Sequence, residues 1–251
     1  MRRNIIGMNG KTLTGILIGF LFCAIIWASP DAAVASFGHG ESDPTLIIDP
    51  GHGGEDGGAV SLTGTLESSI NLDIGFKLKE VCSFLGIPSV MTRESNELSY
   101  PETCTTTSQR KRWDTQQRIK MIRSTPGGIL LSIHQNIYPT SAPSGSQVLY
   151  GEDFKGEEFG KLLHQNLIFT LNPENRRVAV PADKDIYIMS HAQCTAALVE
   201  CGFLSHPEES VLLDIDSYRL KIAAVLAGSV LQFMEDTDED EDSVLLHRVR
   251  Q

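Results

Sequence analysis

The chain has 251 residues, of which 41% are hydrophobic, and its formal net charge is -11. A chain of this length and composition can bury one sizeable core, and the hydrophobic pattern indicates a single domain. The negative charge disfavours nucleic-acid binding, because a protein that binds the phosphate backbone needs a basic surface.

Residues 1–35 have the pattern of an export segment. Arg2, Arg3 and Lys11 precede a mostly apolar stretch, 13–27, that carries no charge. This stretch is short for a membrane span and typical of the hydrophobic part of a signal peptide, and small residues after it offer a cleavage site. We therefore predict a signal peptide or a membrane anchor, with the catalytic domain outside the cytoplasm and membrane contact through this segment alone.

The rest of the chain divides into a linker, a domain and a tail. Residues 36–44 are predicted to be the linker and residues 45–234 the domain. Residues 235–251 begin with an acidic run. Such a run cannot bury itself, so we predict a disordered tail.

The most specific stretch joins an apolar run to a glycine-rich turn. Residues 45–48 are apolar and mostly β-branched, which predicts a buried strand, and Pro50 and Gly51 end it. His52 follows directly. Ligands of open α/β sheets bind beyond the carboxyl ends of the strands, so His52 is a candidate functional residue, although a turn histidine can also have no role.

A helix is predicted to begin at Glu67, because Ile70, Ile74 and later apolar residues recur at helical spacing. Gly86 is typical of the residue that ends a helix. Glu67 therefore lies at a helix N-terminus, where a carboxylate also has a structural explanation, since it complements the helix dipole by roughly 0.3 to 1 kcal/mol. Residues 88–93 predict the next strand.

A basic helix and a second histidine-ended strand follow. Residues 108–124 predict a helix rich in Arg, Lys and Gln, whose basic face is either solvated or in contact with an acidic substrate. Residues 129–134 predict a buried strand that ends on His134. A second strand that ends on a histidine strengthens the case for a site at this edge of the sheet.

The remaining pattern predicts further strands at 147–150, 185–189 and 196–200, and helices at 157–171, from 207, and at 218–233. The strand at 196–200 ends on Glu200, and a charged residue that closes an apolar strand needs a partner or a task. Strands that alternate with helices predict an α/β fold, with a single domain in which a mostly parallel central sheet has helices on both faces.

Four groups thus share one edge of the predicted sheet: His52, Glu67, His134 and Glu200. Two neutral imidazoles and one carboxylate form a common ligand set of catalytic zinc, with the fourth position left for water. Zn²⁺ lowers the pKa of that water to about 7 and polarises a carbonyl, so the site could hydrolyse an amide. A further carboxylate must accept the proton of the water, and spacing alone leaves both Glu200 and Glu67 open for that role.

Four blocks of the sequence resemble the signature blocks of the zinc-dependent N-acetylmuramoyl-L-alanine amidases of bacterial cell walls: LIIDPGHGGEDGGAV, GTLESSINLDIG, ILLSIHQN and ALVECGFLSHPEES. The resemblance extends from about residue 45 to residue 233. It implies that His52, Glu67 and His134 bind zinc and that Glu200 is the catalytic carboxylate. It also implies peptidoglycan as the substrate, cleaved between N-acetylmuramic acid and L-alanine.

Shorter segments resemble the sporulation branch of this family, whose enzymes help to make muramic lactam in the spore cortex: SQRKRWDTQQRI, SIHQN, SGSQVLY and NPENRR. A general amidase of wall remodelling or cell separation would share the four main blocks, so it is the alternative. The chain departs from the family at His206, where Asn is usual. His206 would compete as a zinc ligand if its ring turned inward.

Two other classes of function fit parts of the pattern. One is a zinc peptidase that cuts within the stem peptide, and the other is a non-catalytic wall-binding regulator of the same fold. A regulator would be expected to have lost a metal ligand or the base, whereas all four groups are present here. The sequence does not identify an activating protein partner.

Overall fold

The structure is a computed structural model that describes residues 44–152 and 154–249. The export segment predicted at 1–35 and the linker up to residue 43 lie outside the described residues. Among the helices that the structure describes, none is both long enough and apolar enough to cross a membrane.

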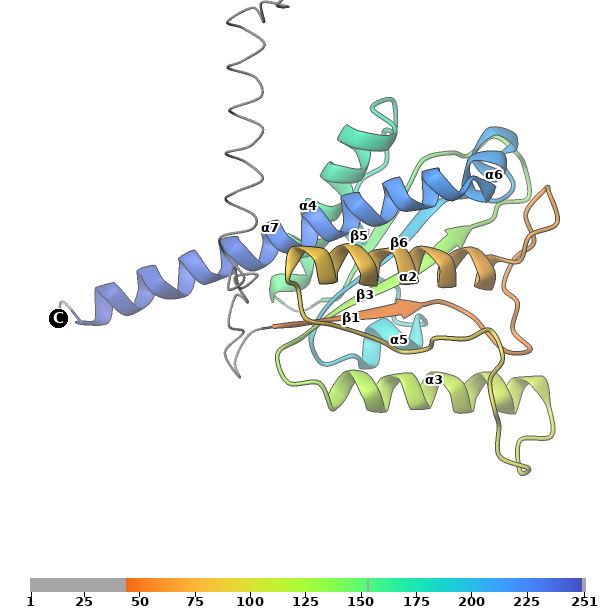
Figure 1. Ribbon diagram of the computed structural model, residues 1–251, viewed down its shortest axis with the longest axis horizontal. Helices are drawn as coiled ribbons and strands as arrows, with labels where there is room; N and C mark the ends of the chain where they lie inside the picture. The colour runs from red at the N-terminus through yellow and green to blue at the C-terminus, as the bar shows by residue number, and fades with distance from the viewer. Residues whose placement is uncertain (1–43, 153, 250–251) are drawn as a thin grey trace, which may run out of the picture. The chain divides into compact units, whose positions relative to one another are not determined.

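A six-stranded sheet forms the centre of the domain (Figure 1). Its strands are β1 Thr45–Pro50, β2 Ser89–Met91, β3 Gly128–Asn136, β4 Gln147–Tyr150, β5 Val180–Pro181 and β6 Thr195–Phe203. Their order across the sheet is β2-β1-β3-β6-β4-β5. The pairs formed by β2, β1, β3 and β6 are parallel, whereas β4 runs antiparallel to β6. The predicted mostly parallel sheet is confirmed.

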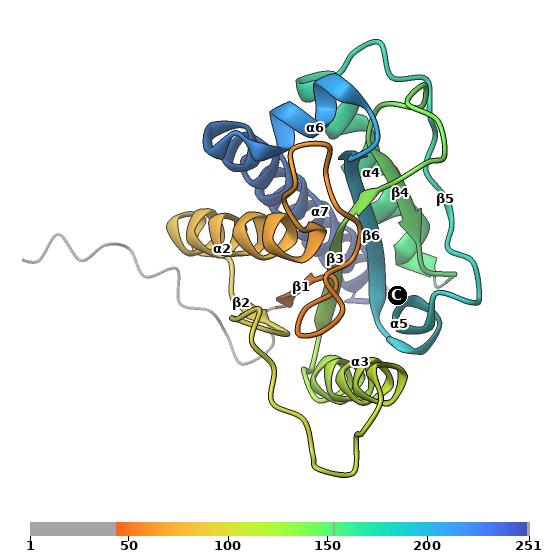
Figure 2. The same cartoon turned by 90° about the vertical axis from the view of Figure 1, so that its right-hand side faces the viewer.

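Helices cover both faces of this sheet (Figure 2). They are α2 Glu67–Leu85, α3 Thr107–Arg123, α4 Phe154–Leu171, α5 Tyr187–His191, α6 Pro207–Asp214 and α7 Asp216–Val249. Alternate residues of β1 serve the two faces, as the strand period of two requires. Leu46 and Ile48 join the core with α2, α4 and α7, whereas Ile47 joins the core with α3 and α5. The predicted single α/β domain is confirmed.

The bounds of α2 match the prediction and place one functional candidate. Glu67 is its first residue, and Gly86 ends it with a left-handed backbone, φ 76°. The Gly86 N–H donates to the carbonyls of Cys82 and Ser83, which satisfies the free end of the helix. Glu67 is therefore fixed at the start of a helix that packs on the sheet.

Residues 185–189 do not form the predicted strand. The structure has the helix α5 there, and Ile188 and Ala192, four residues apart, bury against the core beneath α3. A short apolar run does not distinguish a strand from a helix by its period, which explains the wrong prediction. The strand that pairs with β4 at the edge of the sheet is β5, which the sequence does not predict.

Residues 235–251 are predicted to form a disordered tail. In the structure the helix α7 instead continues to Val249. Leu226, Val230 and Phe233 anchor α7 in the core. Nucleation is the costly step of helix formation, and extension of an existing helix costs little per residue. The acidic run therefore extends a helix that the core has already nucleated.

The anchoring of α7 is testable with two leucines of that helix. Leu226 is fully buried, so we expect Leu226→Ala to lower the free energy of unfolding by about 2 to 5 kcal/mol, since it leaves a cavity. Leu220 is 45% exposed, and Leu220→Ala should cost about 0.5 kcal/mol or less. Urea unfolding measures both, and equal losses would contradict this account of the core.

Candidate metal centre

The loop after β1 holds His52 in an unusual backbone conformation. Its φ is 62°, and for a residue with a Cβ this left-handed conformation costs roughly 1 to 2 kcal/mol. Glycines let the loop lie close to the site, because a Cβ at Gly51 would be 2.1 Å from His134 Nε2. A Cβ at Gly58 would be 2.8 Å from the His52 ring. Close packing therefore fixes the position of His52.

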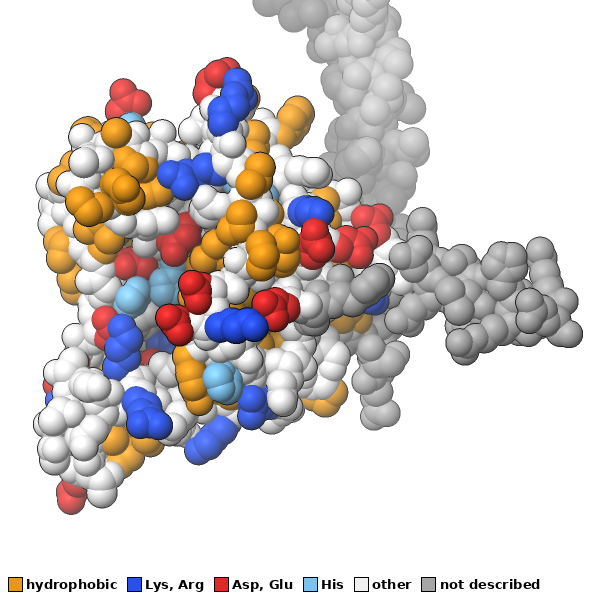
Figure 3. All heavy atoms as spheres, turned by 180° about the vertical axis from the view of Figure 1, so that it is seen from behind, with side chains coloured by type: hydrophobic (Ala, Val, Ile, Leu, Met, Phe, Trp, Pro, Cys, Tyr) orange, Lys and Arg blue, Asp and Glu red, His pale blue; other side chains and the backbone are white. Residues whose placement is uncertain are grey.

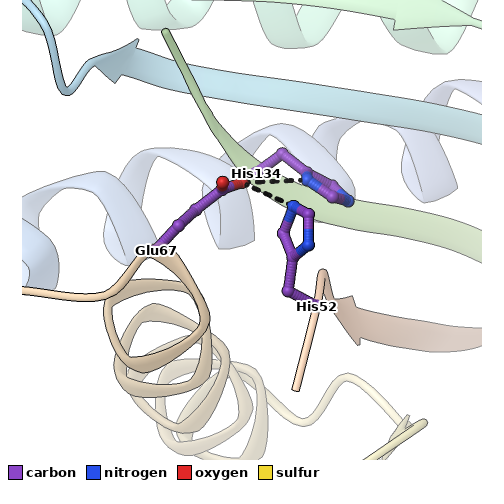
Figure 4. Close-up of side chains that lie close together, drawn as sticks. All are labelled: His52, Glu67 and His134. Atoms are coloured by element: carbon purple, nitrogen blue, oxygen red, sulfur yellow. Dashed lines mark hydrogen bonds and ion pairs between the residues drawn. The ribbon is translucent and has the colours of Figure 1, made fainter. Parts of the chain in front are cut away.

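Glu67 brings the two predicted histidines together (Figure 4). Its Oε1 lies 3.2 Å from His52 Nε2 and 3.1 Å from His134 Nδ1. The two rings are edge to face, with centroids 4.9 Å apart. His52 follows β1 and His134 lies in the neighbouring strand β3, so both come from the carboxyl ends of parallel strands.

The spacing of these three groups fits a metal ion. One ligand atom from each residue lies within 4.8 Å of the others. Zinc ligands at about 2.0 to 2.1 Å in a tetrahedral arrangement lie roughly 3.3 Å apart. The two distances from Glu67 Oε1 are close to that separation, so Glu67 is placed to share such an ion with both histidines.

Backbone donors also orient the Glu67 carboxylate. Its Oε2 accepts from the Ala59 N–H at 2.9 Å, and its Oε1 accepts from the Gln135 N–H at 3.1 Å. Burial opposes ionisation, but the hydrogen bonds with His134 and His52 outweigh it and hold the pKa of Glu67 below its usual range. The carboxylate is therefore ionised at neutral pH, as a metal ligand must be.

Asp56 supports the far side of the His52 ring. His52 Nδ1 lies 3.0 Å from Asp56 Oδ2, and Lys111 Nζ from α3 lies 2.8 Å from the same oxygen. Burial opposes protonation of the imidazole, but the hydrogen bonds with Asp56 and Glu67 raise the pKa of His52 to about 9. A carboxylate on the second ring nitrogen is the usual way to orient a metal-binding histidine.

Glu200 lies beside this cluster but outside it. It is the register partner of His134 on the adjacent strand β6. Its Oε2 is buried and has no hydrogen-bond partner among the residues that the structure describes. Burial raises the pKa of Glu200 to about 7. Glu67 thus lies with the two histidines. Glu200 lies next to them as a carboxyl group whose pKa is near neutral pH.

A cleft of about 330 Å³ opens onto the site, with His52 and His134 among its lining residues and α3 and α5 on either side. Figure 3 shows histidine side chains in a hollow of this face, bordered by acidic and basic side chains. On the α3 side, Arg110 pairs with Glu55 and Lys111 with Asp56. These two basic residues therefore bind the loop after β1, an arrangement that neither interpretation of the basic helix anticipated.

His206 does not turn inward. It is the N-cap of α6, where its Nδ1 accepts from the Glu209 N–H at 3.4 Å. It is outside the cluster formed by His52, Glu67 and His134. The departure from the usual Asn therefore leaves the candidate metal centre intact.

The family model for N-acetylmuramoyl-L-alanine amidases matches residues 46–232. The chain belongs to this family. The predicted family and the predicted amidase activity are thereby confirmed, and the match spans each of the strands and helices that build the site.

Among curated proteins, the amidase is 34% identical over 196 residues to the germination-specific N-acetylmuramoyl-L-alanine amidase of Bacillus subtilis, covering 78% of this chain and 81% of the relative. It is 27% identical over 192 residues to the amidase LytC of the same organism, covering 75% of this chain and 35% of LytC. Among solved structures, the CwlD amidase of Clostridioides difficile, in complex with the GerS lipoprotein, has a TM-score of 0.73 and 32% identity. That alignment covers 77% of this chain and 99% of CwlD.

Sequence reasoning missed Asp56 as a residue of the site. The sequence did carry a signal for it, because Asp56 is a carboxylate four residues after His52 within the same glycine-rich run. The contact from Lys111 on α3 had no such signal, because only the packing of α3 brings it to the loop.

The role of Asp56 can be measured through metal affinity. We expect Asp56→Ala to weaken zinc binding about 10- to 100-fold, because the His52 ring loses the group that orients it. Asp183→Ala is the matched control, since Asp183 is exposed and its carboxylate contacts the Asp185 N–H. Competition with a chromogenic chelator measures both, and unchanged affinity in Asp56→Ala would refute the orienting role.

Proposed function

We propose that this amidase uses zinc to hydrolyse the amide bond between the lactyl group of N-acetylmuramic acid and the L-alanine of the stem peptide in peptidoglycan. One observation carries the metal assignment: the ligand atoms of His52, Glu67 and His134 lie within 4.8 Å of one another. Two imidazoles and one carboxylate are a donor set of catalytic zinc, which leaves a position open for water.

In this proposal three residues bind the metal and a fourth transfers the proton. His52 Nε2, Glu67 and His134 Nδ1 hold the zinc, which when bound polarises the amide carbonyl and activates water. Glu200 accepts the proton of the attacking water and passes it to the leaving nitrogen. A base with a pKa near the working pH is best suited to both steps, and the pKa of Glu200 is about 7.

We also propose a role in maturation of the spore cortex, through muramic-lactam formation. The similarity to a germination-specific amidase supports this role. General wall remodelling or cell separation is the alternative. The enzyme would act outside the cytoplasm, secreted or anchored by residues 1–35. We also propose a protein partner, because the CwlD structure is a complex with a lipoprotein.

Mass spectrometry of the products tests the reaction. Peptidoglycan incubated with the zinc-loaded protein should yield a free lactyl carboxyl group on muramic acid and a new N-terminus on L-alanine. His134→Ala is the control and should release neither, because a metal ligand is lost. Cleavage within the stem peptide, with the muramoyl amide intact, would instead show a peptidase, and zinc binding without any cleavage would support a non-catalytic regulator.

Glu200→Gln separates the base from the ligands. Gln keeps the shape of Glu but cannot accept the proton, so we expect amide cleavage to fall by at least about two orders of magnitude. Zinc stoichiometry and thermal stability should match the wild type, because Glu200 lies outside the ligand cluster. Glu208→Gln, at an exposed position of α6, is the matched control and should remain fully active.

Two outcomes would overturn the assignment of Glu200. Loss of zinc from Glu200→Gln would make Glu200 a ligand and leave Glu67 as the candidate base. Cleavage at the wild-type rate would show that Glu200 is neither a base nor a required ligand.

A further inference from the structure

Two buried arginines surround the backbone that leads to His52. Arg93 follows β2 and Arg118 lies on α3, and each is 5% exposed. A buried charge is costly unless its hydrogen-bonding groups are satisfied. The acceptors of each guanidinium therefore indicate what the arginine holds in place.

Each of the five N–H groups of Arg93 has an acceptor, and four of the acceptors are backbone carbonyls. They are the Pro50 carbonyl at 2.8 Å, the Gly51 carbonyl at 3.0 Å, the Ser68 carbonyl at 2.8 Å, the Ser95 carbonyl at 3.2 Å and Asn96 Oδ1 at 3.0 Å. Pro50 and Gly51 directly precede His52, and Ser68 directly follows Glu67. The guanidinium thus joins the backbones beside two of the candidate metal ligands.

Arg118 binds the same loop from the opposite side of the sheet. It donates to the Pro50 carbonyl at 2.7 Å and to the His52 carbonyl at 2.6 Å. It also donates to Asp49 at 3.0 Å and to Asp114 at 2.9 Å, so carboxylates balance its charge. The Pro50 carbonyl accepts from both arginines, and together they bind three consecutive carbonyls, those of residues 50 to 52.

These contacts constrain the strained conformation of His52. A change of its φ from 62° would rotate the peptide groups on either side, whose carbonyls are the ones that the arginines bind. Lysine could not replace either arginine, because an ammonium has three donors and lacks the planar fork of a guanidinium.

We propose that Arg93 and Arg118 are positioning residues of the metal centre: together they hold His52 in its left-handed conformation, and Arg93 also fixes the start of α2 that carries Glu67. This inference rests on the proposed metal site. It predicts that metal affinity depends on two side chains that do not themselves contact the metal.

Zinc affinity of the full-length protein, measured by competition with a chromogenic chelator, tests the proposal. Arg93→Lys should raise the zinc dissociation constant about 10- to 100-fold, the usual effect of losing a group that orients a ligand. Asn96→Ala removes one acceptor of Arg93 and keeps the guanidinium, so it should act in the same direction with a smaller effect. If Arg93→Lys does not fold, the zinc dissociation constant of Asn96→Ala tests the proposal in its place.

A matched control distinguishes positioning from general stability. Arg219 on α7 is also largely buried, and its guanidinium binds Asp73 and the Leu213 carbonyl, away from the loop. Arg219→Lys should lower the melting temperature and leave the zinc dissociation constant unchanged. Equal losses of zinc affinity in Arg219→Lys and Arg93→Lys would overturn the proposal.

A double-mutant cycle tests whether Arg118 acts through His52. Arg118→Lys should weaken zinc binding in the wild type but add no further loss in a His52→Ala background, since the ligand that it positions is gone. Fully additive losses would overturn the proposal for Arg118. If the wild type binds no zinc, both the positioning role and the proposed function are wrong. If the wild type and Arg93→Lys bind zinc tightly and with equal affinity, only the positioning role is wrong.

Discussion

The carboxylate of Glu67 binds groups from two segments that lie far apart in the sequence, the loop between β1 and α2 and the strand β3. It contacts His52 after β1, His134 in β3 and the Ala59 N–H in the loop between β1 and α2. Because Glu67 is the first residue of α2, its position depends on the packing of that helix against the sheet. The candidate metal centre therefore exists only once β1, β3 and α2 are assembled.

The loop between β1 and α2 depends on partners from both faces of the sheet. Arg93 ties it to the first turn of α2, and Arg118 ties it to α3. Two surface pairs, Arg110 with Glu55 and Lys111 with Asp56, add further contacts between α3 and the loop. The basic face of α3 thus helps to support His52, and the acidic residues of the loop offset its charge.

Much of the fold could be predicted because its signals are local. The apolar strand before Pro50, the helical spacing from Glu67 and the glycine at 86 each predict an element from adjacent residues. The secondary-structure predictions were wrong where the conformation of a segment depends on tertiary contacts. Residues 185–189 form a helix because of what they bury against, and the acidic run is helical because it continues an anchored helix.

The site was predictable to a similar degree. His52, His134 and Glu200 were identified because each lies where an apolar strand reaches the edge of the sheet. The resemblance to the amidase family assigned the roles of Glu67 and Glu200. Spacing alone left these two roles open, because both residues reach the same edge and spacing does not give distances between side chains. Arg93 and Arg118 were missed for the same reason, since their acceptors at residues 50 to 52 are distant in the sequence.

X-ray absorption spectroscopy combined with an anomalous-diffraction map of the zinc-loaded protein would test the central claim most directly. We expect one zinc ion bound by His52 Nε2, His134 Nδ1 and a Glu67 oxygen at about 2.0 to 2.1 Å, with Glu200 uncoordinated beside it. Zinc bound by Glu200 in place of Glu67, or located at His206, would contradict the arrangement described here.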